Sequence, residues 1–147
     1  MKVNEVPQDK SFLEEGKVRD VCYATDENGD YKKVLSVGWE PKNEAIKLAW
    51  EDIAENAHDI AKEVLDGKKS PLAYYLEIKA MTVKILSDYT GISRFRVKKH
   101  LKPEKFNKLS DSVLKKYAEA LHLSVDELCS IDMIKKEIED NEDRLPA

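Results

Sequence analysis

The chain has few of the residues on which several protein classes depend, because its 147 residues include only two cysteines, five glycines and five prolines. Cys22 and Cys129 are distant in sequence and have no CxxC or Cys/His spacing, which predicts reduced thiols and no disulfide framework. No apolar run approaches the roughly 20 residues that cross a bilayer, and the N-terminus has no apolar signal core. We therefore expect a cytoplasmic protein without a membrane segment.

The residue patterns of common catalytic and metal sites are missing as well. The three histidines, His58, His100 and His122, lie on separate expected helices, and the sequence has neither a nucleophile elbow nor a glycine-rich phosphate loop. Residues 26–30 (DENGD) have spaced carboxylates, but the glycine comes too early for a calcium-binding loop and no Glu closes it. We predict no enzymatic activity, no metal and no cofactor.

The chain carries a formal charge of −4, which is distributed unevenly along it. Residues 68–108 hold 11 Lys/Arg against 3 Asp/Glu, whereas residues 1–67 and 109–147 are both acidic. A basic segment between acidic flanks indicates where a polyanion would bind, since the field is concentrated on one part of the surface. A solvated, lysine-rich helix surface is the alternative explanation.

The first structured part is expected to be a β-hairpin followed by a long helix. Residues 18–25 and 31–39 are β-rich and enclose an Asn-Gly pair that tolerates a tight turn. Within residues 39–71, Asn43 is the expected N-cap and Gly67 the expected end of the helix. Apolar residues recur there at helical spacing, at Ile46, Ala49, Trp50, Ile53, Ala57, Ile60, Ala61, Val64 and Leu65. This stripe can cover the hairpin or pair with a copy of itself.

From Ser70 onward the sequence divides into short helical segments. Pro71 begins the first of them, Gly91 permits a left-handed corner, and Ile92 is expected to fill the gap between two helices. Residues 102–108 are expected to form a connecting loop. The expected N-caps are Thr82, Ser93, Ser110 and Ser124, and the last of these forms a capping box with Glu127. The expected core positions are Leu72, Tyr75, Leu76, Leu86, Val97, Leu101, Val113, Leu114, Tyr117, Ala118 and Leu121.

Residues 70–130 resemble the phage repressor/Cro-type (XRE-like) helix-turn-helix family. The resemblance is carried by Thr82, Leu86, the Thr-Gly-Ile-Ser corner at residues 90–93, Val97, and the closing pattern LSDSVLKKYAEALHLSVDEL. It implies a bundle of four or five helices that binds double-stranded operator DNA, with helix 93–101 in the major groove, and that dimerises. The sequence departs from the family at Val83, where Gln often clamps a phosphate, and at His100, where an aliphatic residue is usual.

The outward face of helix 93–101 supports DNA binding independently, because it holds four cations and no carboxylate. Arg94 is placed for bidentate contact with guanine, Phe95 for packing on a thymine methyl, and Lys99 for a second base edge. Phe95 as a core residue remains the alternative. The expected phosphate contacts are Thr82, Ser93, Arg96, Lys98, Lys102, Lys105 and Lys108.

The expected fold is mainly α with a small α+β N-terminal part, and residues 66–71 are the expected hinge. Along the chain we expect a flexible N-terminus (1–17), a hairpin-plus-helix appendage (18–67), the helix-turn-helix domain (70–132) and an acidic tail that frays (133–147).

The expected function is sequence-specific DNA binding by a repressor-like transcriptional regulator, a homodimer with a possible protein partner at residues 18–66. Two alternatives remain open. One is an antitoxin-like or adaptor module whose N-terminal part binds another protein, with DNA binding autoregulatory or lost. The other is a helical bundle that has no partner.

Overall fold

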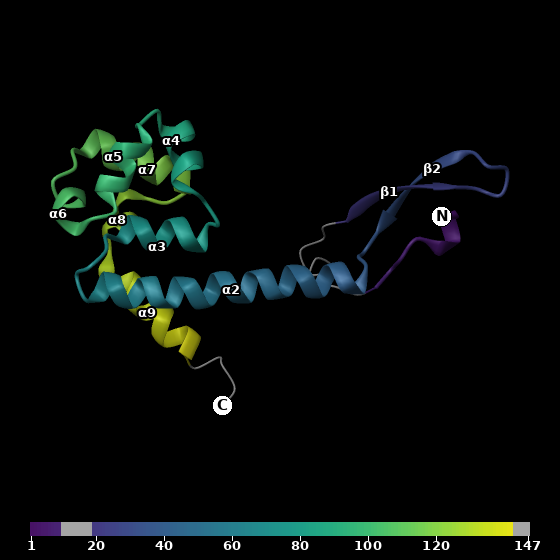
Figure 1. Ribbon diagram of the computed structural model, residues 1–147, viewed down its shortest axis with the longest axis horizontal. Coiled ribbons are helices and arrows are strands. Elements are labelled where there is room, and N and C mark those ends of the chain that lie inside the picture. Colours follow the sequence, from purple (N-terminus) through teal and green to yellow (C-terminus); the bar gives the residue numbers. More distant parts are fainter. Residues whose placement is uncertain (10–18, 143–147) are drawn as a thin grey trace. The chain divides into compact units, whose positions relative to one another are not determined.

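The computed structural model describes residues 1–9 and 19–142. The chain divides into two compact units, Met1–Glu51 and Asp52–Ala147. The division between them lies inside helix α2 (Glu40–Leu65). The hinge expected at residues 66–71 stays a prediction. The mainly helical fold with an N-terminal hairpin, predicted from the sequence, is confirmed (Figure 1).

In the N-terminal unit, strands β1 (Asp20–Thr25) and β2 (Tyr31–Ser36) form an antiparallel hairpin. The turn between them depends on Asp26, whose carboxylate accepts hydrogen bonds from the backbone N–H groups of Asn28 (2.9 Å) and Asp30 (3.0 Å). Gly29 has φ +86°, a conformation that suits glycine. The DENGD segment therefore acts as a turn, as the sequence predicted.

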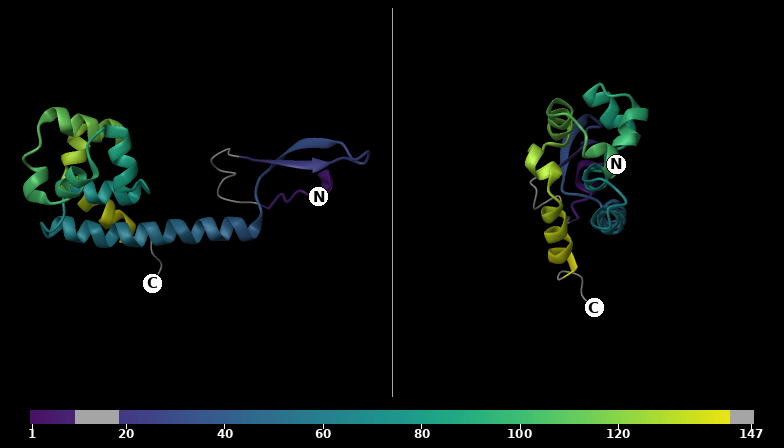
Figure 2. Two further views of the ribbon diagram at one scale, coloured as in Figure 1. Left: turned by 45° about the horizontal axis from the view of Figure 1, so that its top comes forward. Right: turned by 90° about the vertical axis from the view of Figure 1, so that its left-hand side faces the viewer.

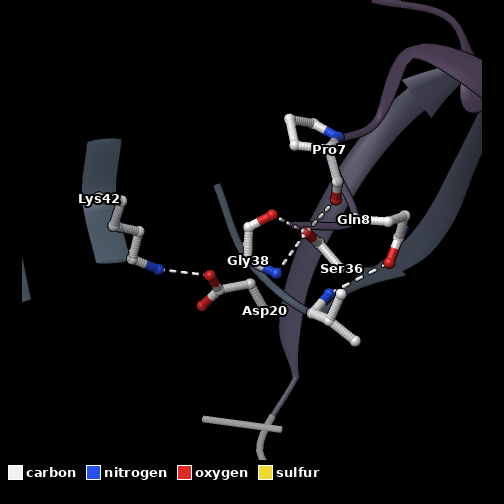
Figure 3. Close-up of polar contacts among 7 residues, drawn as sticks. Pro7, Gln8, Asp20, Ser36, Gly38 and Lys42 are labelled. Atoms are coloured by element: carbon white, nitrogen blue, oxygen red, sulfur yellow. Dashed lines mark hydrogen bonds and ion pairs between the residues drawn. The ribbon is translucent and has the colours of Figure 1, made fainter. Parts of the chain in front are cut away.

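The first nine residues are ordered against the hairpin, so the expectation of a frayed N-terminus is wrong for them; residues 10–17 lie outside the described part. A short 3₁₀ helix, η1 (Val3–Glu5), is followed by the buried side chain of Val6. Buried Ser36 donates a hydrogen bond to the Pro7 carbonyl (2.5 Å), and Gln8 accepts one from the N–H of Val37 (3.2 Å; Figure 3). These contacts span almost thirty residues of sequence, which is why local patterns did not reveal them.

Helix α2 begins at Glu40, one turn before the cap that the sequence indicated. The Glu40 N–H donates to the carboxylate of Asp9 (2.9 Å), so a residue distant in sequence caps the helix. Asn43 is therefore not a cap: it is buried inside the first turns, and its side-chain amide has no hydrogen-bond partner. The cap could not be recognised from sequence because only the tertiary structure brings Asp9 to this helix end.

The C-terminal unit is a bundle of short helices packed against one side of the last turns of α2 (Figures 1 and 2). Gly67, at φ +72°, ends α2 as predicted, and Ser70 and Pro71 start the next helix. The helices that follow are α3 (Pro71–Ile78), α4 (Val83–Thr90), α5 (Arg94–His100), α6 (Pro103–Phe106), α7 (Asp111–Leu121), α8 (Val125–Cys129) and α9 (Ile131–Glu142).

Two segments of this bundle differ from expectation. Residues 103–106, which we expected in a loop, form α6, because Phe106 is buried in the core and ties the segment down. Residues 133–142, which we assigned to a frayed tail, belong to α9, whose Ile134 and Ile138 are buried in the same core. Of the stripe on α2, Ala57, Ala61 and Val64 are buried, whereas Ala49, Trp50 and Leu65 are exposed.

Candidate nucleic-acid interface

Helices α4 and α5 meet at a corner whose geometry follows from three residues. The hydroxyl of Thr82 accepts a hydrogen bond from the N–H of Ile85 (3.2 Å) and caps α4. Gly91 adopts the left-handed conformation at φ +68°, and Ile92 is buried directly after it. The corner predicted from residues 90–93 is therefore present, and it fixes where α5 begins.

Helix α5 is held by one side and exposes the other. Val97 is completely buried and His100 is buried, so both attach the helix to the core. Ser93 occupies the N-cap position as predicted, although its hydroxyl makes no capping hydrogen bond. The outward residues are Arg94, Phe95, Arg96, Lys98 and Lys99, all of them exposed.

Phe95 is 68% exposed, which excludes the alternative that it is a core residue. The ammonium group of Lys99, one turn later, lies 4.4 Å from the centroid of the Phe95 ring. This cation–π contact was not anticipated, although the i,i+4 spacing on a helix could have indicated it. It joins two of the three residues that we expected to contact bases into one surface patch.

The cations expected at phosphates are all exposed on α5 or on the segment that follows it. Arg96 and Lys98 are on α5, and Lys102, Lys105 and Lys108 lie along and beside α6. Within the described residues, none of the five forms an ion pair with a carboxylate, and neither does Arg94 or Lys99. Their charges are therefore not neutralised by the protein itself.

Other lysines of the basic segment are already paired. Lys68 contacts Asp66 (2.9 Å) and Lys69 contacts Glu63 (2.5 Å). The hydrogen bond and charge of Asp66 raise the pKa of Lys68. The unpaired positive charge of residues 68–108 is thus concentrated on and after α5. Two further cations, Lys79 and Lys84, are exposed and form no ion pair within the described residues. The sequence analysis did not assign Lys84, which lies in the first turn of α4. Its place two residues after the Thr82 cap was the available signal.

A buried polar pair supports α5 from behind. The His100 Nδ1 atom lies 2.7 Å from the Tyr117 hydroxyl on α7, and the two rings meet edge to face. Burial, with a smaller contribution from the charge of Arg96, lowers the pKa of His100, and burial raises the pKa of Tyr117 to about 12. The Ser70 hydroxyl donates to the His100 carbonyl (2.8 Å). His100, unusual for the resembled family, is therefore a packing residue that orients α5.

A family model of the Cro/C1-type HTH DNA-binding domain matches residues 72–132. These residues form a Cro/C1-type helix-turn-helix domain. The resemblance noted from the sequence is confirmed, and DNA binding is the function of this domain type. The Cro/C1-type domain covers α3 to α8 and the start of α9, so the N-terminal unit lies outside it.

Neither the curated proteins nor the solved structures contain a match to the chain. None of the helices described is long and apolar enough to span a bilayer. Across residues 1–9 and 19–142, no three His, Cys, Asp or Glu side chains gather in a way that could hold a metal ion.

Proposed function

We propose that the protein is a transcriptional regulator that binds specific double-stranded DNA sequences as a homodimer and reads the major groove with α5. The observation that carries the proposal is the outward face of α5 in a Cro/C1-type domain, where four cations and one aromatic ring are exposed without a carboxylate. Such a face is suited to bind DNA, whose phosphates are negatively charged. It is poorly suited to contact an ordinary protein surface.

The roles follow from position along α5. Arg94 is in the first turn, where side chains of a recognition helix reach base edges, and its guanidinium can make two hydrogen bonds to guanine. Phe95 offers an apolar surface for a thymine methyl, and Lys99 lies over its ring. Arg96 and Lys98 lie further around α5, and Lys102, Lys105 and Lys108 lie along and beside α6. These five cations would contact phosphates. Thr82, Ser93 and Lys84, near the first turns of α4 and α5, would contribute there too.

The test is selection from a random duplex library by the purified full-length protein at moderate salt. We expect enrichment of a short motif, in palindromic form if the protein binds as a dimer. Retention of duplexes without a motif would contradict sequence-specific reading. If no duplex is retained, the DNA-binding proposal itself is wrong.

A second candidate is an antitoxin-like or adaptor role in which the N-terminal unit binds another protein. The observation in its favour is the N-terminal unit's share of exposed apolar side chains: nine of the fifteen large ones among the described residues lie before residue 52. In that case the protein would be purified with a stoichiometric partner polypeptide, and removal of nucleic acid by high salt would leave that complex intact.

A further inference from the structure

Phe95 and Lys99 form one composite surface on the outward side of α5. Phe95 lies two residues before Val97 and Lys99 two residues after it, and positions two residues apart on a helix are about 200° apart around its axis. Because Val97 is completely buried, both side chains point away from the core. The Lys99 ammonium group lies 4.4 Å from the centroid of the exposed Phe95 ring. An apolar surface and a hydrogen-bond donor therefore lie side by side.

The packing of α5 determines where this pair lies. Val97 and His100 attach the helix to the core, and the Ser70 hydroxyl donates a hydrogen bond to the His100 carbonyl (2.8 Å). In the part of the chain that the structure describes, Lys99 forms no ion pair. Its ammonium group has three N–H donors, so it can contact the ring and still donate to a ligand.

The pair matches the edge that thymine presents in the major groove. Thymine has a C5-methyl group beside the O4 acceptor, and no other standard base has a methyl group there. A phenyl ring can pack on the methyl group while an adjacent ammonium group donates to O4. Cytosine presents an amino group at the equivalent place, and this donor would face the ammonium donor of Lys99 without an acceptor between them.

The other exposed side chains of α5 also disfavour the bases that present amino groups. Arg94, Arg96 and Lys98 are donors only, and the helix contains no Asp, Glu, Asn or Gln. The amino groups of adenine and cytosine would therefore find no side-chain acceptor on the outward face of α5. Guanine and thymine, which present oxygen acceptors in the major groove, are the bases that this face can bind.

We infer that Phe95 and Lys99 together form a subsite for thymine, in which the ring receives the C5-methyl group and the ammonium group donates to O4. The inference rests on the proposed function and deepens it, since it assigns one base of the target sequence to a defined pair of side chains. Removal of one group of the base should cost only the part of the affinity that the matching side chain provides.

The test changes single groups on the DNA. Each thymine of the selected motif is replaced in turn by deoxyuridine, which lacks only the methyl group, or by 5-methylcytosine paired with guanine, which keeps the methyl group but has an amino group in place of O4. At one position, deoxyuridine should weaken wild-type binding about fourfold, as expected for one methyl group. There 5-methylcytosine should weaken it about tenfold, as expected for a hydrogen bond to a charged group. Cytosine, which lacks both groups, should bind most weakly.

Two variants separate the contributions of the two side chains. Phe95→Ala should bind the thymine and deoxyuridine duplexes equally and still discriminate against 5-methylcytosine. Lys99→Met should lose the preference for thymine over 5-methylcytosine and keep the preference for thymine over deoxyuridine. Lys98→Ala is the control, because Lys98 is another exposed lysine of α5 and is assigned to a phosphate; it should weaken binding to all four duplexes by the same factor. Each comparison is a ratio of affinities for one protein preparation, so partial misfolding of a variant cancels.

Failure of this inference can be told apart from failure of the proposed function. A wild type that selects a motif but binds thymine and deoxyuridine equally at every position would refute the thymine subsite alone. A motif without thymine would do the same, and so would discrimination against deoxyuridine that persists unchanged in Phe95→Ala. If the protein retains no duplex at all, both the subsite and the DNA-binding proposal are wrong.

Discussion

At the scale of single residues, Arg94 is the side chain that the proposal makes responsible for base preference. It is exposed in the first turn of α5 and forms no ion pair within the described residues. Arg94→Ala should weaken binding to the selected motif by about 1–3 kcal/mol and relax the preference at one base pair. Competition with single-base variants of the motif measures this.

Lys98→Ala is the matched control, since Lys98 lies on the same helix and is also exposed. It should weaken binding to every duplex alike, as expected of a phosphate contact. If Arg94→Ala left the base preference at all positions unchanged, Arg94 would not be a base-reading residue.

His100 is the residue with the clearest dependence on pH. Its folded-state pKa is lowered by burial from an ordinary value of 6.5, so the unfolded chain binds more protons as the pH falls below that value. The contribution of neutral His100 to stability should therefore be fully present well above pH 6.5 and be lost as the pH falls below it. Glu127, whose pKa is lowered by hydrogen bonds from Ser124, loses its contribution only in the more acidic range below its ordinary 4.5.

The variant that tests this carries His100→Leu together with Tyr117→Phe. The second change is needed because a Tyr117 hydroxyl without His100 would be buried and unpaired, which costs about 1–3 kcal/mol. Urea unfolding of the double variant should show a smaller loss of stability between pH 7.5 and 5 than the wild type. An identical loss in both proteins would contradict the role of His100.

At the scale of elements, the short helix α8 depends on its N-terminal cap. The Ser124 hydroxyl accepts from the Glu127 N–H (3.1 Å), and the Glu127 carboxylate accepts from the Ser124 N–H (2.7 Å). This capping box positions Leu128, which is completely buried. Ser124→Ala should reduce the free energy of unfolding by about 1 kcal/mol.

Ser110 provides the comparison for this prediction, because it occupies the N-cap position of α7 without a capping hydrogen bond from its side chain. Ser110→Ala should change the unfolding midpoint less than Ser124→Ala does. Equal effects of the two substitutions would mean that the capping box contributes little to stability.

At the scale of the whole molecule, the clustering of cations on and after α5, in a chain that is acidic overall, should determine how DNA binding depends on salt. Five exposed cations on and after α5 are expected at phosphates, in a chain whose net charge is −4. The logarithm of the binding constant should fall linearly with the logarithm of salt concentration, and removal of one phosphate contact should reduce the slope by about 0.9.

Lys105→Ala tests this slope, and Lys68→Ala is its control. Lys105 has no ion-pair partner within the described residues, whereas Lys68 is paired with Asp66 at 2.9 Å. We expect the smaller slope for Lys105→Ala only, with the base preference unchanged. The same slope in wild type and Lys105→Ala would place Lys105 outside the DNA interface.

The sequence by itself determined the features that depend on neighbouring residues. The hairpin and its turn, the end of α2 at Gly67, the Thr82 cap, the left-handed corner at Gly91 and the capping box at Ser124 were all predicted. Each of these rests on backbone conformation or hydrogen bonding within a few residues, so the local sequence contains the whole cause. The Cro/C1-type pattern is a succession of such signals, which is why the domain could be recognised.

Only the tertiary structure decided the features that depend on distant partners. Asp9 caps α2 in place of Asn43, Pro7 and Gln8 order the N-terminal segment on the hairpin, and burial of Phe106 and Ile134 extends helix into segments expected to be loop or tail. The exposure of Phe95 was decided in the same way. Burial is a property of the assembled core, because whether an apolar side chain faces protein or water depends on elements that the local sequence does not contain.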